Sequence, residues 1–262
     1  MLSYRDLLTA FTRLGVPRGK PVIVHASLSS FGEVRGGAET VVGALINAFP
    51  GVIAPTFTYK TMITPEVGPP DNGMVYGSGK NANRMAQFFR PDMPADPTIG
   101  KIPETLRQHP QAKRSNHPIL SFAGINAYPA LAAQTLAEPL APIRKMVNAQ
   151  GWVLLLGVDH TVNTSLHYAE KLAGRKQFTR WALTPSGIYE CPAFPGCSDG
   201  FEAIVPHIKD VTHHQQIGEA SVQAIPLQEM LEIARQLIEQ DPQALLCNLP
   251  NCPRCNVVRE TQ

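Results

Sequence analysis

The sequence is poor in charged residues and carries no strong excess of either sign. Asp, Glu, Lys and Arg make up 17% of the 262 residues, and the formal net charge at pH 7 is +2. A net charge this small excludes nucleic acid or an anionic membrane surface as the main partner. Long apolar runs are also missing, because none approaches the ~20 residues that a membrane-spanning helix requires.

Signals for secretion are missing as well. Segment 1–16 carries its apolar residues at helical spacing with charges between them, which predicts an amphipathic helix rather than a signal peptide. The five cysteines are an odd number and argue against a secreted disulfide framework. We therefore expect a cytoplasmic protein. The sequence leaves open whether the chain forms a homodimer.

Short apolar runs alternate with amphipathic segments along the chain, which predicts an α/β fold with at least partly parallel strands. No linker is visible, so we expect a single domain over 1–262, with a long loop-rich insert at 60–98 and a cysteine-bearing tail at 247–262. The expected strands are 21–25, 51–59, 119–125 and 151–158. The expected helices are 1–16, 36–49, 102–110, 141–150 and 167–174, the last with Gly174 as its C-cap, and a turn followed by an amphipathic helix is expected at 221–242.

In open α/β sheets, ligands bind beyond the carboxyl ends of the strands, and this rule selects two segments. The first, "HASLSSFGEVRGGAET" at 25–40, has three serines and a Gly36-Gly37 pair at a helix start. Glycines admit a ligand close to the backbone, and free N–H groups at a helix start favour anions. The segment is neither a P-loop nor a G-x-G-x-x-G motif. An ordinary polar loop with helix caps explains it equally well.

The second segment, "LLLGVDHTVNTSLHYAE" at 154–170, follows the most apolar run with acids, histidines and small polar residues. Asn163, Thr164 or Ser165 can cap a new helix. His167 then lies in its first turn with Glu170 on the same face, as in a general base whose imidazolium is stabilised by a carboxylate. The segment lacks the H-E-x-x-H and G-x-S-x-G motifs. A histidine–glutamate pair that only fixes the helix start remains an alternative.

The roles of two further groups of residues stay open at this point. Arg114 and Ser115, in "RSNHPILSF", have the chemistry to meet a phosphate, but an arginine beside a strand is more often a surface ion-pair partner. Cys247, Cys252 and Cys255 have C-x4-C-x2-C spacing, and a tetrahedral zinc site would need a fourth ligand, such as Cys191 or Cys197. Reduced thiols without metal are the favoured interpretation.

Three segments in order resemble the aminoglycoside 3-N-acetyltransferase family, an acetyl-CoA-dependent family distinct from the GNAT acetyltransferases. They are "VHASLSSFGEVRGGAETVVGAL", "GKIPETLRQHPQAKRSNHPILSFAG" and "GWVLLLGVDHTVNTSLHYAE", and the resemblance runs from about residue 5 to residue 247. It implies an α/β/α layered sandwich around a mixed sheet, with acetyl-CoA as cosubstrate and a small-molecule amine as the acceptor.

The resemblance also implies roles for individual residues. His167 would be the catalytic base with Glu170 as its acidic neighbour, and Thr164 would lie close to the thioester. Asp159, Asn163, Glu170 and Tyr59 become candidates for the acceptor side. The candidates for the CoA site are His25, Ser27, Leu28, Ser29, Ser30, Val34, Gly36, Gly37, Arg114 and Ser115.

The acceptor is the least determined part of the prediction. The resemblance implies acetylation of the 3-amino group of aminoglycosides by direct transfer. Aminoglycosides are polycations, yet the charges of insert 60–98 are nearly balanced. An N-acyltransferase of the same fold that acts on a different amine is therefore the alternative.

Overall fold

The computed structural model describes residues 1–261, so that of the cysteine-bearing tail only Gln262 lies outside the described range. Its main sheet has seven strands in the order β4-β5-β2-β1-β6-β10-β9. The three central strands β2, β1 and β6 are parallel, and the outer pairings are antiparallel. The strands are β1 (Val22–Ala26), β2 (Val52–Pro55), β4 (Lys113–Arg114), β5 (Phe122–Ile125), β6 (Trp152–Leu156), β9 (His213–Ile217) and β10 (Ala220–Pro226).

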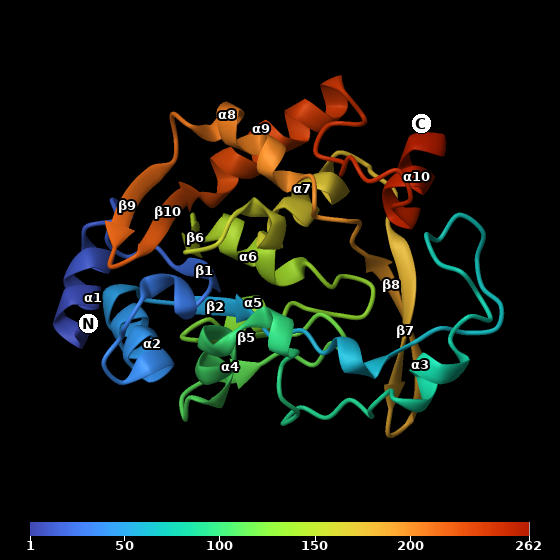
Figure 1. The fold of residues 1–262 in the computed structure, drawn as a ribbon, viewed down its shortest axis with the longest axis horizontal. Coiled ribbons are helices and arrows are strands. Elements are labelled where there is room, and N and C mark those ends of the chain that lie inside the picture. Colours follow the sequence, from blue (N-terminus) through green and yellow to red (C-terminus); the bar gives the residue numbers. More distant parts are fainter. Residues whose placement is uncertain (262) are drawn as a thin grey trace.

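Helices cover both faces of this sheet because successive side chains of its strands point to opposite sides. In β6, Val153 and Leu155 belong to one hydrophobic core, and Leu154 and Leu156 belong to the other. The first core is closed by α5 (Tyr128–Leu131), α6 (Ala141–Asn148), α7 (Leu166–Leu172) and α9 (Leu227–Gln240). The second is closed by α1 (Tyr4–Thr12), α2 (Gly37–Ala48) and α4 (Lys101–Gln108). The expected α/β/α layers are confirmed (Figure 1).

A second, three-stranded sheet was not expected from the sequence. The antiparallel hairpin of β7 (Phe178–Thr184) and β8 (Gly187–Phe194) is extended by the short β3 (Met62–Ile63) of the insert. Figure 1 shows this hairpin, together with α3 (Lys80–Arg84) of the insert, on the side of the molecule away from α1 and α2. The helices α8 (Val205–Ile208) and α10 (Pro253–Glu260) complete the fold.

The expected turn at the start of 221–242 is wrong. Residues Ala220–Pro226 form β10, which pairs with both β6 and β9. Pro226 is the last residue of this strand, where its missing N–H does not interrupt the ladder. The expected amphipathic helix follows as α9.

None of the helices in the described part of the chain has the length and apolarity needed to cross a membrane.

Candidate active site

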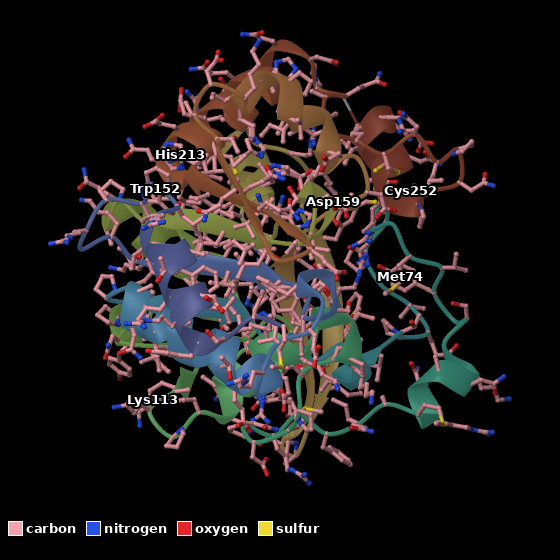
Figure 2. The ribbon with its side chains drawn as sticks, turned by 60° about the vertical axis from the view of Figure 1, so that its left-hand side comes forward. Met74, Lys113, Trp152, Asp159, His213 and Cys252 are labelled. Carbon is pink, nitrogen blue, oxygen red and sulfur yellow. The ribbon has the colours of Figure 1, made fainter. Side chains whose placement is uncertain are left out.

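A cavity of about 1610 Å³ opens beyond the carboxyl ends of β1 and β6. Figure 2 shows this end of β6, marked by Asp159, on the same side of the molecule as Cys252 and away from Trp152 at the start of the strand. Segments far apart in the sequence line the cavity. Among them are Ser27–Ser29 after β1, Tyr59 and Asp96–Lys101 near the ends of the insert, Thr164 and His167, Arg180 and Phe194–Gly196 of the hairpin region, and Arg254 of the tail.

His167 is the titratable group at the centre of the candidate chemistry. It lies in the first turn of α7, which follows Ser165. The N–H of Ser165 donates a hydrogen bond to Asn163 Oδ1. Its Nδ1 lies 2.6 Å from Oε2 of Glu170, and its ring packs against that of Phe201 with 4.7 Å between centroids. Its Nε2 has no hydrogen-bond partner among residues 1–261, and the residue lines the cavity. This arrangement fits a base with one nitrogen oriented and the other available.

Glu170 does not line the cavity itself but lies behind His167, and Arg175 holds it there. Arg175 Nη1 donates to Glu170 Oε1 at 2.8 Å, and both side chains are only 1% exposed. Arg175 Nη2 also donates to the carbonyls of Pro242 and Ala244. The ion pair gives Glu170 a partner in the interior, where an unpaired carboxylate would be costly.

Arg175 was not among the residues expected from the sequence. A helix places partners three or four residues apart, whereas Arg175 is five residues after Glu170. The C-cap of α7 is Ala173, one residue before the expected Gly174. Gly174 follows it with φ of 75°, in the left-handed conformation, and turns the chain back. This glycine was the available signal, because the residue after such a turn bonds back to the helix end, as the Arg175 N–H does to the Glu170 carbonyl.

The loop after β1 contributes most of the expected cofactor-site residues. His25, Ser27, Leu28, Ser29, Val34 and Gly37 line the cavity, whereas Ser30 and Gly36 do not. Ser30 Oγ instead donates to the Gly157 carbonyl at 2.7 Å, and Gly36 begins α2 in the left-handed conformation. The N–H groups of Leu28, Ser29 and Ser30 have no hydrogen-bond partner within the described chain. Of these three residues, Leu28 and Ser29 line the cavity, where their N–H groups could meet a ligand.

His25 is a neutral imidazole at physiological pH. Burial, with a smaller contribution from the nearby His160, lowers its pKa to about 3. Its Nε2 is buried and has no partner among the described residues. The ring thus presents a hydrogen-bonding group, not a charge, beside the cavity.

The remaining candidates from the second segment divide between the cavity and the core. Thr164 lines the cavity, as does Tyr59 of the acceptor-side candidates. Asn163 points into the core, where its Nδ2 contacts His160 Nδ1 and Met230. Asp159 is exposed, and its carboxylate caps the short helical turn at Thr161.

Arg114 and Ser115 are not brought to the cavity. The Arg114 guanidinium donates to the Thr56, Pro91 and Met93 carbonyls and to the Ser121 hydroxyl. Ser115 Oγ bonds the backbone of Phe122. With four hydrogen bonds to the protein, Arg114 fastens the end of the insert to the sheet and has little capacity left for a phosphate.

Charged side chains of both signs line the cavity. Most of them could not be predicted from the sequence, because they come from separate segments. The acids are Asp96, Glu104 and Asp199, and the bases are Lys101, Arg180 and Arg254. Glu104 is already paired with Arg107 at 2.7 Å. The cavity therefore has no strong net charge.

The tail cysteines Cys247, Cys252 and Cys255 meet Cys197, whereas Cys191 lies apart from them in β8. No cysteine of the described chain lines the cavity.

Comparisons with known proteins give a consistent result. The family model for aminoglycoside 3-N-acetyltransferase matches residues 23–239. Aminoglycoside N(3)-acetyltransferase III of Salmonella sp is 28% identical over 278 residues, covering 92% of each chain.

Solved structures agree on the fold. The apoenzyme of aminoglycoside acetyltransferase AAC(3)-IVa superimposes with a TM-score of 0.79 over 99% of this chain and 98% of its own, at 23% identity. A binary complex of AAC-IIIb with CoASH gives a TM-score of 0.72 over 91% of this chain and 97% of its own, at 24% identity.

Proposed function

The chain belongs to the aminoglycoside 3-N-acetyltransferase family, and from that premise we propose that it transfers the acetyl group of acetyl-CoA to the 3-amino group of an aminoglycoside, with His167 as general base. The observation that carries the proposal is the pair of His167 and Glu170, 2.6 Å apart, with His167 lining a large cavity. A relative of the same family is named for this activity.

The base is required because an ammonium group is not a nucleophile. His167 Nε2 accepts a proton from the amine before or during attack on the thioester carbonyl carbon. The imidazolium that forms is stabilised by Glu170, which Arg175 holds in place. When the tetrahedral intermediate collapses, the carbon–sulfur bond breaks and the thiolate of CoA takes up a proton.

The loop after β1 is suited to acetyl-CoA. Its free N–H groups, with the hydroxyls of Ser27 and Ser29, can bind the diphosphate or stabilise an oxyanion, and Lys101 at the start of α4 adds a positive charge to the cavity wall. Thr164 lines the same cavity beside His167. Direct transfer in a ternary complex is favoured, because no cysteine of residues 1–261 lines the cavity to form a thioester with the protein.

A different amine is the second candidate for the acceptor. The acids Asp96 and Asp199 are accompanied by Lys101, Arg180 and Arg254, so the attraction for a polycation is modest. This balance favours an acceptor of lower charge than an aminoglycoside. The transfer chemistry would be the same.

Release of the CoA thiol from acetyl-CoA, measured with a panel of amines, tests the proposal. The panel contains aminoglycosides with and without a 3-amino group, together with simple amines. We expect turnover with the aminoglycosides that carry a 3-amino group and none with those that lack it. Binding of acetyl-CoA without turnover of any aminoglycoside would contradict the proposed acceptor, and turnover of simple amines would favour the second candidate.

Gly157→Ala is expected to weaken acetyl-CoA binding roughly tenfold, because a left-handed backbone and a steric clash coincide at this position. Gly157 has φ of 67°, and a Cβ added there would lie 2.2 Å from Cβ of Ser30. The loop after β1 would have to move away. Calorimetric titration with acetyl-CoA measures the change. Gly19→Ala is the matched control, since Gly19 has φ of 83° but nothing within 4 Å of the added atom; equal affinities of the two variants would contradict the expectation.

A further inference from the structure

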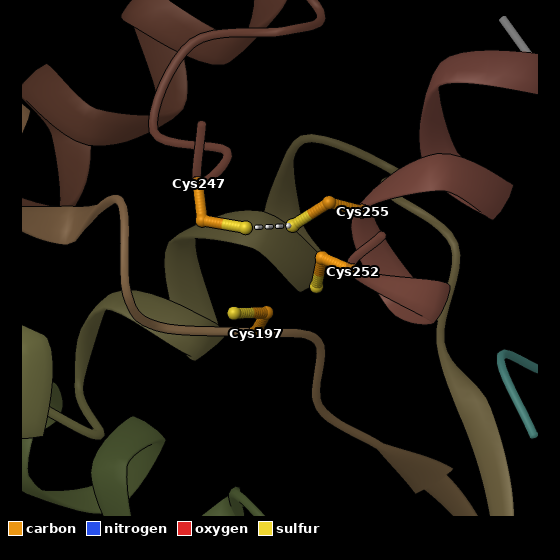
Figure 3. Close-up of side chains that lie close together, drawn as sticks. All are labelled: Cys197, Cys247, Cys252 and Cys255. Atoms are coloured by element: carbon orange, nitrogen blue, oxygen red, sulfur yellow. Dashed lines mark hydrogen bonds between the residues drawn. The ribbon is translucent and has the colours of Figure 1, made fainter. Parts of the chain in front are cut away.

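Four cysteines gather where the C-terminal tail meets the loop after β8. The sulfur atoms of Cys197, Cys247, Cys252 and Cys255 all lie within 4.8 Å of one another, and all four residues are buried. Figure 3 shows the side chains pointing toward one another from three segments, with Cys247 Sγ 3.4 Å from Cys255 Sγ. The fifth cysteine, Cys191, is not part of this group.

The tail carries too little apolar surface to fix its own position. Apart from its cysteines, Val258 is its only hydrophobic residue in the buried core among the described positions after 247, and Leu249 is 55% exposed. The short helix α10 has a largely polar sequence. Segments with so little hydrophobic burial usually depend on a disulfide or a metal ion to stay folded.

We propose that these cysteines bind one structural Zn²⁺ ion. Four thiolates in a tetrahedron are a preferred zinc site, and zinc–sulfur bonds of about 2.3 Å place neighbouring sulfurs about 3.8 Å apart. Cys247 Sγ and Cys255 Sγ, 3.4 Å apart, would separate slightly, and the sulfurs that lie up to 4.8 Å apart would approach, so small shifts reach that geometry. Because all four ligands come from buried side chains, no coordination position is left for water or substrate, and the ion is structural rather than catalytic.

Arg259 adds a positive charge beside the cysteines. Its guanidinium donates a hydrogen bond to the Cys247 carbonyl. This charge offsets part of the negative charge of a zinc tetrathiolate.

The ion would also fix one wall of the cavity. Phe194, Pro195 and Gly196, which line the cavity, lead directly into Cys197, and Arg254 lies between Cys252 and Cys255. The tail backbone packs closely here, since a Cβ on Gly200 would lie 2.4 Å from the Leu246 carbonyl. Loss of the metal is therefore expected to release Arg254 and the wall together.

Metal analysis of the purified full chain, isolated without chelators, tests the proposal. We expect about one zinc per chain in the wild type and less than about 0.2 in Cys252→Ser, with thermal unfolding of the variant several degrees lower. The control Cys191→Ser removes a buried cysteine outside the group and should keep its zinc. Less than about 0.2 zinc per wild-type chain, or stoichiometric iron instead, would overturn the proposal.

Thiol counting covers the case in which Cys252→Ser does not fold. Wild-type protein unfolded with a chelator should release its zinc and yield all five thiols. Two missing thiols, as a disulfide between Cys247 and Cys255 would give, would overturn the zinc site. Neither measurement depends on acetyl transfer, so a metal-free enzyme with normal turnover would contradict this inference and leave the proposed function intact.

Discussion

His167→Ala is expected to lower kcat by roughly 10²–10⁴ while acetyl-CoA binds with unchanged affinity. His167 lines the cavity, and its Nδ1 lies 2.6 Å from the buried Glu170 carboxylate. Without the imidazole, the acceptor amine must lose its proton to water. Steady-state kinetics of thiol release, combined with calorimetric titration of acetyl-CoA, separate the loss of chemistry from a loss of binding.

The control is His207→Ala, because His207 is an exposed histidine of α8 that does not line the cavity. This variant should retain the wild-type kcat. If His167→Ala turns over within about threefold of the wild type, His167 has no part in the proton transfer. If it loses acetyl-CoA binding as strongly as kcat, its role is in binding rather than in catalysis.

Arg175→Met is expected to lower the free energy of unfolding by about 3–5 kcal/mol, because it breaks a buried ion pair and leaves the Glu170 carboxylate uncompensated. Both side chains are 1% exposed. The substitution also removes the donor to the Pro242 and Ala244 carbonyls, which join α7 to the chain after α9. Urea unfolding at neutral pH measures the change.

Lys171→Met is the matched control, since Lys171 belongs to the same helix but pairs with Glu138 at the surface, where the two side chains are 28% and 45% exposed. Solvent screens this pair, and its loss should cost less than about 1 kcal/mol. An effect of Arg175→Met no larger than that of Lys171→Met would contradict the stabilising role assigned to the buried pair.

The sequence predicted the central strands and the pairing of His167 with Glu170 because both depend on short-range patterns. Apolar runs gave β1 and β6, and i,i+3 spacing on a helix gave the pair. The hairpin β7–β8 was missed, since only alternate residues of β7 are buried and β8 is largely exposed over its first half. Such strands leave no continuous apolar run to find.

The walls of the cavity could not be predicted, because they form where distant segments meet. Lys101, Arg180 and Arg254 come from α4, β7 and the tail, and nothing in their local sequence indicates a common site. The motif match placed Arg114 at the cofactor, yet its guanidinium donates to the carbonyls of Pro91 and Met93 in the insert and to that of Thr56 after β2. Cys197 lies about fifty residues before the three tail cysteines and was one of two candidates for a fourth ligand. Only the fold shows that Cys197, and not Cys191, lies beside them.

The position of acetylation is the measurement that tests the proposed reaction most directly. Wild type and His167→Ala are each incubated with acetyl-CoA and an aminoglycoside that carries several amino groups, and the product is mapped by mass spectrometry and NMR. We expect a single acetyl group on the 3-amino nitrogen with the wild type and almost no product with the variant. Acetylation at another amine, or equal amounts of product from both proteins, would contradict the proposed reaction.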